Sequence, residues 1–302
     1  MIRSKSIITE LFNSKKVGIQ LNDEQLTHLQ SHLFQMYKDI EAVCVKHGLK
    51  VCIAYGNVLG AVRHNGWIPW DDDLDIHMPR EDYELFLTKY YKELPKKYRV
   101  SSYLSPDGSI ARFAKIIDTS TVFVPAMDEK NEYSGVFLDI FPIDNIGSNR
   151  IINSLRKYCL YFLMYTASSV LQVERNSQTY KEIMYSTSAG RQNWQLRQLI
   201  GRVFSFVSSR TWHRWIEKFW IIRKKTGYVH VKSAMTMCGM KVPAEVFYPF
   251  KKVYTSVGEV FVPNDTEKYL DIIYGNWRNI PDIQHREHHF LKEMVLPGKS
   301  GN

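Results

Sequence analysis

Hydrophobic residues recur every three to four positions between residues 22 and 47, which is the period of an amphipathic helix. The repeat is formed by Leu26, Leu29, Leu33, Tyr37, Ile40 and Cys44. Asn22 followed by Gln25 is typical of a capping box, and Gly48 suits the position just after the last turn. We therefore expect a capped helix over this range with one face against a core.

The period changes after this helix. An apolar run at 51–55 predicts a short strand that ends at Gly56, and 58–64 is expected to form a short helix. From Asp73 to Met78 polar and apolar side chains alternate, which predicts a second strand. A strand, a glycine-containing turn, a short helix and another strand thus follow one another closely.

The remaining chain mixes both periods. We expect helices at 80–91 and 265–274, strands at 112–117 and 136–141, mainly helix at 153–225 and part of a hairpin at 257–262. Because strands and helices alternate irregularly, the predicted fold class is α+β, with a mixed sheet and helices packed on it.

Charge divides the chain of 302 residues, whose formal net charge is +9. Residues 1–149 carry 17 basic and 20 acidic side chains, whereas 150–225 carry 14 basic and only 3 acidic ones. A hydrophobic share of 44% excludes a disordered chain. The basic excess favours an anionic partner, such as nucleotide phosphates, nucleic acid or a membrane surface.

The spacing of the cysteines and the sequence of the N-terminal segment indicate the cellular compartment. Four cysteines without a Cys-x-x-Cys pair predict reduced thiols rather than a disulfide framework or a zinc site. The start of the chain has no apolar segment typical of a signal peptide, and no window of about 18 apolar residues predicts a membrane span. We expect a cytoplasmic protein, with peripheral contact to the inner face of the membrane as the alternative.

The run Asp71-Asp72-Asp73-Leu74-Asp75 concentrates negative charge. On a strand, Asp73 and Asp75 would point to the same face about 6.5–7 Å apart, with Leu74 toward the core. Two carboxylates at that separation can hold Mg²⁺, which also accepts phosphate oxygens as ligands. The alternative is a solvated acidic turn with no ligand.

Glycines lie just upstream of these acids. Gly56 and Gly60 flank the expected start of the short helix, where backbone N–H groups can face a phosphate. Close packing of the backbone is the alternative reason for glycine at both positions. A strand, a glycine turn, a short helix and a strand that carries Asp-x-Asp is more specific, because it is the arrangement of the nucleotidyltransferase fold.

The segment GNVLGAVRHNGWIPWDDDLDI, which starts at Gly56, resembles the signature of the LicD/fukutin family of phosphoryl-group transferases. The pattern G-x-x-L-G-A-x-R-x-x-G-x-I-P-W-D-D-D-x-D is met in full. The segment FLDIFPID from Phe137 and the segment YGNW from Tyr274 are similar to two further motifs of that family. The resemblance extends over about residues 25–290 and is weakest in the middle helices.

The resemblance implies transfer of a substituted phosphate from a CDP-linked donor to a sugar hydroxyl, with Mg²⁺ or Mn²⁺. It implies a nucleotidyltransferase-like catalytic core at 1–149, a basic helical insertion at 150–230 and a segment at 231–302 that packs back on the core. CDP-choline is the favoured donor. The expected acceptor is a cell-surface or lipid-linked glycan, such as lipopolysaccharide or teichoic acid.

Three acids are predicted to be catalytic and to bind the metal. Asp73 and Asp75 would hold the cation on the donor diphosphate, and Asp139 would complete the site or act as base toward the acceptor. A strand-end cap is the alternative role of Asp139. Asp71 and Asp144 are second candidates that could equally cap loops.

Positive and aromatic groups are predicted to bind the donor. Arg63 lies in the matched motif, with a structural salt bridge as the alternative role. Lys115 is preferred over Arg112, because their spacing on a strand puts them on opposite faces. The remaining predicted donor contacts are Gly56, Asn57, Gly60 and Trp70. An aromatic ring such as Trp70 would suit a choline headgroup through cation–π attraction.

The basic helices also allow a second interpretation. Between 197 and 225, arginines and lysines are interspersed with Phe and Trp, which is typical of a helix on an anionic membrane or of a solvated face packed over a sheet. No nucleic-acid-binding module is recognised, so no nucleic-acid partner is expected.

Three functions therefore remain at this point: phosphocholine transfer, polyol-phosphate transfer with ribitol or glycerol phosphate, and non-catalytic binding of a membrane or nucleic acid. The first two require Mg²⁺-dependent release of CMP. The third requires salt-sensitive binding that loss of Asp75 leaves intact.

Overall fold

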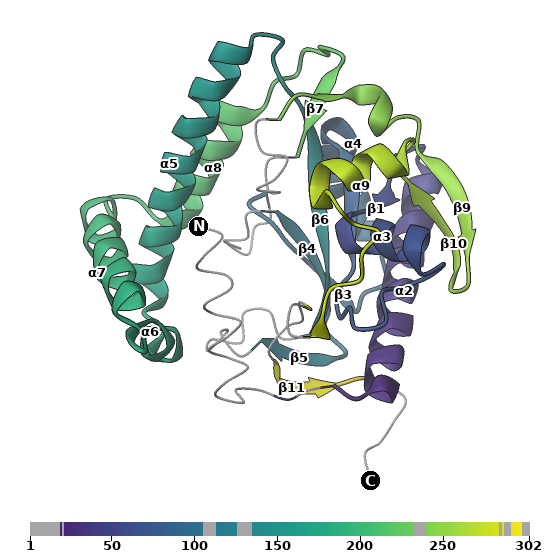
Figure 1. Cartoon of the computed structure of the whole chain (residues 1–302), viewed down its shortest axis with the longest axis horizontal. Coiled ribbons are helices and arrows are strands. Elements are labelled where there is room, and N and C mark those ends of the chain that lie inside the picture. The colour runs from purple at the N-terminus through teal and green to yellow at the C-terminus, as the bar shows by residue number, and fades with distance from the viewer. Residues whose placement is uncertain are drawn as a thin grey trace.

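The computed structural model describes residues 19, 21–104, 113–125, 135–231, 240–283, 286 and 291–297. Its centre is a mixed sheet, and helices pack on both sides of that sheet (Figure 1). The predicted α+β class is confirmed. In the part of the chain that is described, no helix is both long and apolar enough to cross a membrane.

The sheet places five strands in the order β1-β2-β6-β4-β3, and β7 and β8 extend it from one end of β6. Strands β2 and β6 run parallel, and all other pairs in the sheet are antiparallel. The strands are β1 (Cys52–Ile53), β2 (Asp75–Pro79), β3 (Tyr98–Ser101), β4 (Ala114–Asp118), β6 (Val136–Asn145), β7 (Tyr228–His230) and β8 (Val242–Pro243).

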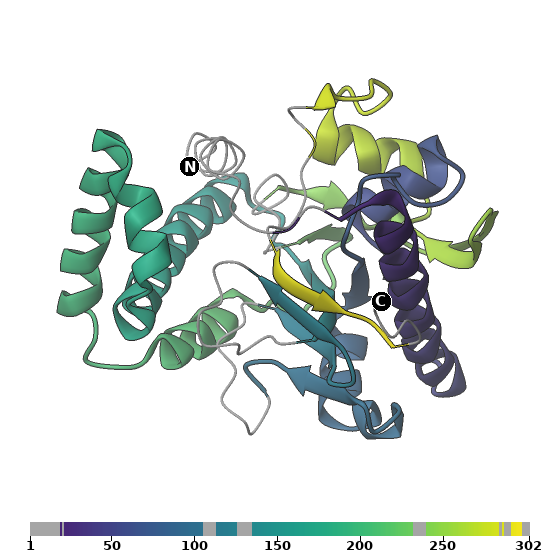
Figure 2. The same ribbon diagram turned by 90° about the horizontal axis from the view of Figure 1, so that it is seen from below.

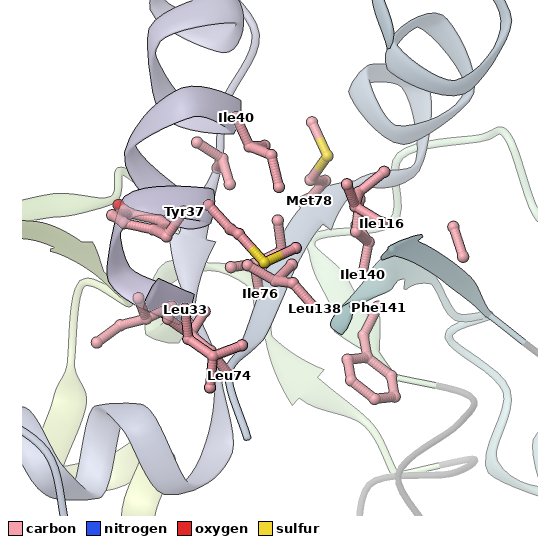
Figure 3. Packing of buried hydrophobic residues seen from close by; sticks show 14 of the residues in the cluster. Leu33, Tyr37, Ile40, Leu74, Ile76, Met78, Ile116, Leu138, Ile140 and Phe141 are labelled. Atoms are coloured by element: carbon pink, nitrogen blue, oxygen red, sulfur yellow. The ribbon is translucent and has the colours of Figure 1, made fainter. Parts of the chain in front are cut away.

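Helix α2 (Asp23–Lys46) covers one face of this sheet. The predicted capping box is confirmed, because Asn22 Oδ1 accepts from the Gln25 N–H and Gln25 Oε1 accepts from the Asn22 N–H. Leu33, Tyr37 and Ile40 pack against residues of the central strands in one buried cluster. Figure 3 shows these side chains facing Ile76, Met78, Leu138 and Ile140.

Other elements surround the sheet. Helix α9 (Thr266–Tyr274) follows the antiparallel hairpin of β9 (Lys251–Thr255) and β10 (Gly258–Val262), and the predicted hairpin and short helix are both confirmed. A separate pair joins β5 (Val122–Pro125) to β11 (Leu291–Val295). The remaining short elements are α3 (Tyr55–Arg63), α4 (Arg80–Thr88), η1 (Tyr90–Glu93) and η2 (Ala244–Val246).

Four helices, α5 (Arg150–Arg175), α6 (Gln178–Tyr185), α7 (Ser188–Val203) and α8 (Ser209–Trp220), stand to one side of the sheet. Figure 2 shows the same separation from below. They have a small apolar cluster of their own, formed by Leu160, Ala167, Val170, Trp212, Ile216 and Trp220. We call α5–α8 the helical region and the rest of the described chain the core.

Buried polar contacts join the helical region to the core. Arg80 donates from Nε and Nη2 to the two carboxylate oxygens of Asp144, over 2.6 and 2.8 Å. Its Nη1 lies 3.1 Å from Oε2 of Glu217 on α8. The indole of Trp220 donates to His230 Nε2 over 2.6 Å. Asp144, a second candidate for catalysis, therefore has a structural partner.

Element boundaries near the acids differ from the prediction. β1 covers only Cys52–Ile53, and α3 already begins at Tyr55 instead of 58, because Ala54 is extended and starts the first turn. β2 begins at Asp75 and not at Asp73, since the backbone around Leu74 bonds with the Asn57 side chain as well as with β6. The strand argument for the spacing of Asp73 and Asp75 was therefore wrong.

Candidate active site

One row of charged residues crosses three neighbouring strands. Asp75 on β2 lies opposite Asp139 on β6, and Asp139 lies opposite Lys115 on β4. Residues directly opposite one another on paired strands point to the same face of a sheet. The alternation along β2 turns Ile76 and Met78 toward α2, so Asp75 faces the other side. The sheet register therefore brings together three of the residues predicted from the sequence.

The row contains both signs of charge. Lys115 Nζ lies 2.5 Å from Oδ1 of Asp139 and 3.7 Å from the ring centre of Phe137. Burial raises the pKa of Asp75 well above its usual range, and the nearby carboxylates of Asp73 and Asp139 raise it further. Lys115 acts in the opposite direction on that pKa but does not cancel the effect. The site thus holds more negative charge than its own cation balances.

A second group of acids precedes β2. Asp71, Asp72 and Asp73 each offer a carboxylate oxygen, and these oxygens lie within 4.8 Å of one another. Gln30 on α2 holds this segment, because its Nε2 donates to the carbonyl oxygens of Ile68 and Asp71. Asp71 was a second candidate from the sequence, and Asp72 was not singled out at all.

Gly56 allows Asp71 to approach the first turn of α3. A Cβ at Gly56 would lie 2.9 Å from Oδ2 of Asp71, so any larger residue would displace that carboxylate. A carboxylate near the N-terminus of a helix is favoured by the partial positive charge there. The close approach of Asp71 therefore explains why a glycine is needed at position 56. Contact between Gly56 and a donor phosphate stays a prediction.

Asn57 connects α3 to the acidic segment. Its Nδ2 donates to the carbonyl oxygen of Asp73 over 3.2 Å, and its Oδ1 accepts from the Asp75 N–H over 2.7 Å. The side chain is only 2% exposed. Asn57 therefore sets the backbone on both sides of Leu74 and orients the two predicted metal ligands. Its direct contact with a donor remains untested.

The start of α3 is held from the far end of the chain. Tyr55 has a φ of +42°, which is unfavourable for a residue with a bulky side chain. Its N–H donates to Tyr269 Oη over 2.9 Å, and Tyr269 Oη donates to His77 Nε2 over 2.8 Å. Burial lowers the pKa of His77 to about 3, so the imidazole is neutral and its Nε2 can accept.

The other predicted donor contacts lie around α3. Arg63 Nη1 donates to the carbonyl oxygens of Trp277 and Asn279, over 2.7 and 3.1 Å, so it joins α3 to the segment after α9. A Cβ at Gly60 would lie 2.6 Å from the Gly66 carbonyl oxygen, which gives this glycine a packing role. The guanidinium of Arg286 lies 3.9 Å from the ring centre of Trp70.

The donor set suits a hard divalent cation. All candidate ligands are carboxylate oxygens, which Mg²⁺, Mn²⁺ and Ca²⁺ prefer. The raised pKa of Asp75 shows that its ionised form lacks sufficient compensation within the protein itself. The geometry also fits a divalent metal, because the carboxylate oxygens of Asp71, Asp72 and Asp73 lie within 4.8 Å of one another. Of the predicted ligands only Asp73 belongs to this group, and the roles of Asp75 and Asp139 as ligands stay predictions.

Three contributors were missed by sequence reasoning, and two of them carry no local signal. Tyr269 lies 192 residues from its partner His77 along the chain, and no local pattern marks it among other tyrosines. Arg286 lies in a segment with no recognisable period, and its place over Trp70 is decided by the fold. Asp72, in contrast, carried a signal, because it belongs to the acidic run itself.

The site combines carboxylates before and at the start of β2 with a glycine-containing helix start beside them. Residues 48–158 match the LicD/FKTN/FKRP nucleotidyltransferase domain. The predicted resemblance to the LicD/fukutin family is confirmed over this segment, which includes Asp73, Asp75, Lys115 and Asp139. The match is narrower than the expected 25–290.

Relatives agree with this assignment. The chain is 32% identical over 121 residues to the lipopolysaccharide cholinephosphotransferase LicD of Haemophilus influenzae, which covers 38% of this chain and 43% of that protein. It is also 41% identical over 70 residues to an uncharacterised protein of Rickettsia prowazekii, covering 21% of this chain and 26% of that protein. The chain thus spans less than half the length of the relatives it matches.

Proposed function

We propose that this protein transfers a substituted phosphate, most favourably phosphocholine, from a CDP-linked donor to a hydroxyl of a cell-surface or lipid-linked glycan. The observation that carries the proposal is the row Asp75–Asp139–Lys115 beside the acids Asp71–Asp73, within the LicD-family domain. The cholinephosphotransferase among the relatives supports phosphocholine as the group transferred.

In the proposed reaction the acceptor oxygen bonds to the phosphorus that carries choline. The bond from that phosphorus to the oxygen of CMP breaks, CMP leaves, and the hydroxyl proton passes to a base. Phosphoryl transfer depends mainly on positioning and on neutralising charge. A divalent cation at Asp73 and Asp75 would neutralise the donor diphosphate and the departing CMP.

The protein's own residues have separate proposed roles. Lys115 holds Asp139 through Oδ1, so Asp139 is oriented to accept the acceptor's proton on Oδ2. Asn57 keeps Asp73 and Asp75 in place through their backbone. Arg63 and Trp70, which lie around α3, are proposed to shape the donor site rather than to take part in proton transfer.

The proposal is tested by following CMP release. The full chain is incubated with Mg²⁺, CDP-choline, and lipopolysaccharide or teichoic acid, and CDP-ribitol and CDP-glycerol replace CDP-choline in parallel. We expect release that EDTA and Asp73→Asn abolish and that Asp23→Asn, an exposed carboxylate on α2, leaves unchanged. If only CDP-ribitol releases CMP, the transferred group is a polyol phosphate and not phosphocholine. If none of the three CDP-linked donors releases CMP, the transferase proposal is refuted.

A further inference from the structure

An unusual number of large apolar side chains is exposed on the helical region. On α5, the residues Ile151, Leu155, Tyr158 and Phe162 are 58–74% exposed. Their spacing of four, three and four residues puts them on one side of the helix. α8 carries Trp215 and Phe219, 43% and 45% exposed. We call this set, together with Val203 at the end of α7 and Phe206 after it, the apolar helix face.

Aromatic contacts make this face continuous across three helices. The ring of Phe162 on α5 lies 6.2 Å from Phe204, and Phe204 lies 6.3 Å from Phe206. Phe206 lies 5.7 Å from Trp212, and Trp212 lies 5.1 Å from Trp215 on α8. Phe206, at 68%, is among the most exposed of these side chains. The exposed rings of Phe162, Phe206 and Trp215 thus pack against partly buried Phe204 and buried Trp212.

Exposed cations are neighbours of these apolar residues in the sequence. Arg150, Arg202, Arg214 and Lys218 are exposed, and each precedes a member of the apolar helix face in the chain. Residues 150–225 contain only three acidic side chains. Glu217 is buried against Arg80, and Glu174 accepts from the Ser209 backbone N–H. The third acid, Glu182, accepts from Gln178 Nε2 on α6. With 14 basic and three acidic side chains, residues 150–225 carry a large excess of positive charge.

We propose that the apolar helix face docks on an anionic lipid bilayer, with Tyr158, Phe162, Phe206 and Trp215 in the interface and the neighbouring cations against lipid phosphates. Aliphatic and aromatic side chains with adjacent Lys and Arg suit this surface, which offers hydrocarbon and negative charge together. A symmetric pair of chains would bring the same cations together, and nucleic acid offers no hydrocarbon for Ile151 and Leu155.

The experiment is flotation of the full chain with lipid vesicles. Vesicles of phosphatidylcholine alone are compared with vesicles containing phosphatidylcholine and phosphatidylglycerol at three to one. We expect binding to the anionic vesicles and little to the neutral ones, with the affinity falling as NaCl is raised because salt screens charge. This result does not depend on the proposed transferase activity, which is measured separately with a soluble acceptor.

Two variants separate the apolar and the charged contributions. Tyr158→Ser with Phe162→Ser should weaken binding at least about tenfold, because two interfacial rings are lost. Arg214→Gln with Lys218→Gln should weaken it about fivefold for each cation and reduce the salt dependence. The matched controls lie on the β9–β10 hairpin, outside the helical region. They are Tyr254→Ser, at a tyrosine that is 79% exposed, and Lys251→Gln, at an exposed lysine.

Several results would overturn the proposal. Equal binding to neutral and anionic vesicles, or equal losses in Tyr254→Ser and in the face variants, would show that the face is not the lipid contact. Light scattering that shows a dimer, converted to a monomer by Tyr158→Ser with Phe162→Ser, would make the face a subunit interface. Tight binding to duplex DNA without vesicle binding would assign the charge to nucleic acid. Circular dichroism confirms that each variant is folded.

Discussion

The core and the helical region of this protein differ in how completely they bury their large apolar side chains. The core sandwiches apolar residues between α2 and the sheet, and its charged row is held by strand register. The helical region is built around a much smaller buried cluster and leaves large side chains such as Tyr158 and Phe206 outside. A sheet fixes the relative positions of distant side chains, whereas amphipathic helices offer a broad surface.

The difference suggests a division of work. Chemistry needs groups held to within a fraction of an ångström, and the row Asp75–Asp139–Lys115 lies on three hydrogen-bonded strands of the sheet. Docking needs area and charge, which the helices supply. The two regions meet at the buried groups Arg80, Asp144 and Glu217, and at the bond from Trp220 to His230.

The largest loss of activity is expected when the charge of Asp75 is removed. Asp75→Asn should reduce CMP release about a thousandfold or more, which is ~4 kcal/mol of transition-state stabilisation. Without metal the same variant should melt at a higher temperature than the wild type, because ionised Asp75 is disfavoured in the fold. Calorimetry with EDTA measures this. Vesicle binding should not change. Loss of both CMP release and vesicle binding in Asp75→Asn would contradict the division of work.

A large loss of stability is expected at the junction. Arg80→Leu leaves Asp144 and Glu217 buried without their guanidinium, which should cost about 3–5 kcal/mol in urea unfolding. Replacing all three residues by apolar ones of similar size should restore most of that stability. A cost below about 1 kcal/mol for the single variant would show that the two regions are not coupled through Arg80.

Low pH should lower the free energy of unfolding through a histidine at the same junction. Burial lowers the pKa of His230 to about 4, so the unfolded chain takes up a proton below about pH 6.5 while the folded chain does not. Stability should therefore fall between pH 6.5 and about 4, by ~1.4 kcal/mol per pH unit for this residue. His77, with a pKa of about 3, adds a similar slope from within the core.

Replacing His230 by Phe separates these two contributions. The variant loses the bond from Trp220 and is expected to be less stable at pH 7, but its slope below pH 6.5 should be smaller than that of the wild type. The slope that remains belongs to His77 and to other titrating groups. Urea unfolding of both proteins at several pH values measures the difference, and equal slopes would exclude His230 as the source.

The smallest effect is expected at the start of α3. Tyr269→Phe removes the partner of the Tyr55 N–H and of His77 Nε2, at a cost of about 1–2 kcal/mol. Because Asn57 is in the same first turns, CMP release should fall several-fold while vesicle binding is unchanged. Tyr254→Phe, a tyrosine on β9 that is 79% exposed, is the control. Equal activity in both variants would show that α3 does not depend on Tyr269.

Local patterns predicted much of this molecule. The capping box of α2 and the hairpin before α9 follow from periods and turn residues. The choice of Asp139 as a partner of Asp75 came from the family resemblance, and the sheet register places the two opposite one another. Boundaries near the acids were wrong by two or three residues, because Asn57 and Ala54 bind backbone groups that a local pattern does not show. The preference for Lys115 agrees with its cross-strand position next to Asp139.

The chain by itself determined which chemistry is present: an acidic run beside a glycine-containing helix start, a basic helical stretch and the LicD-family motif. Only the tertiary structure decided which of these groups meet. Register between distant strands sets Asp75, Asp139 and Lys115 in one row, and packing of α9 brings Tyr269 to Tyr55. Such contacts depend on the packing of the whole chain, because their partners lie far apart along the sequence.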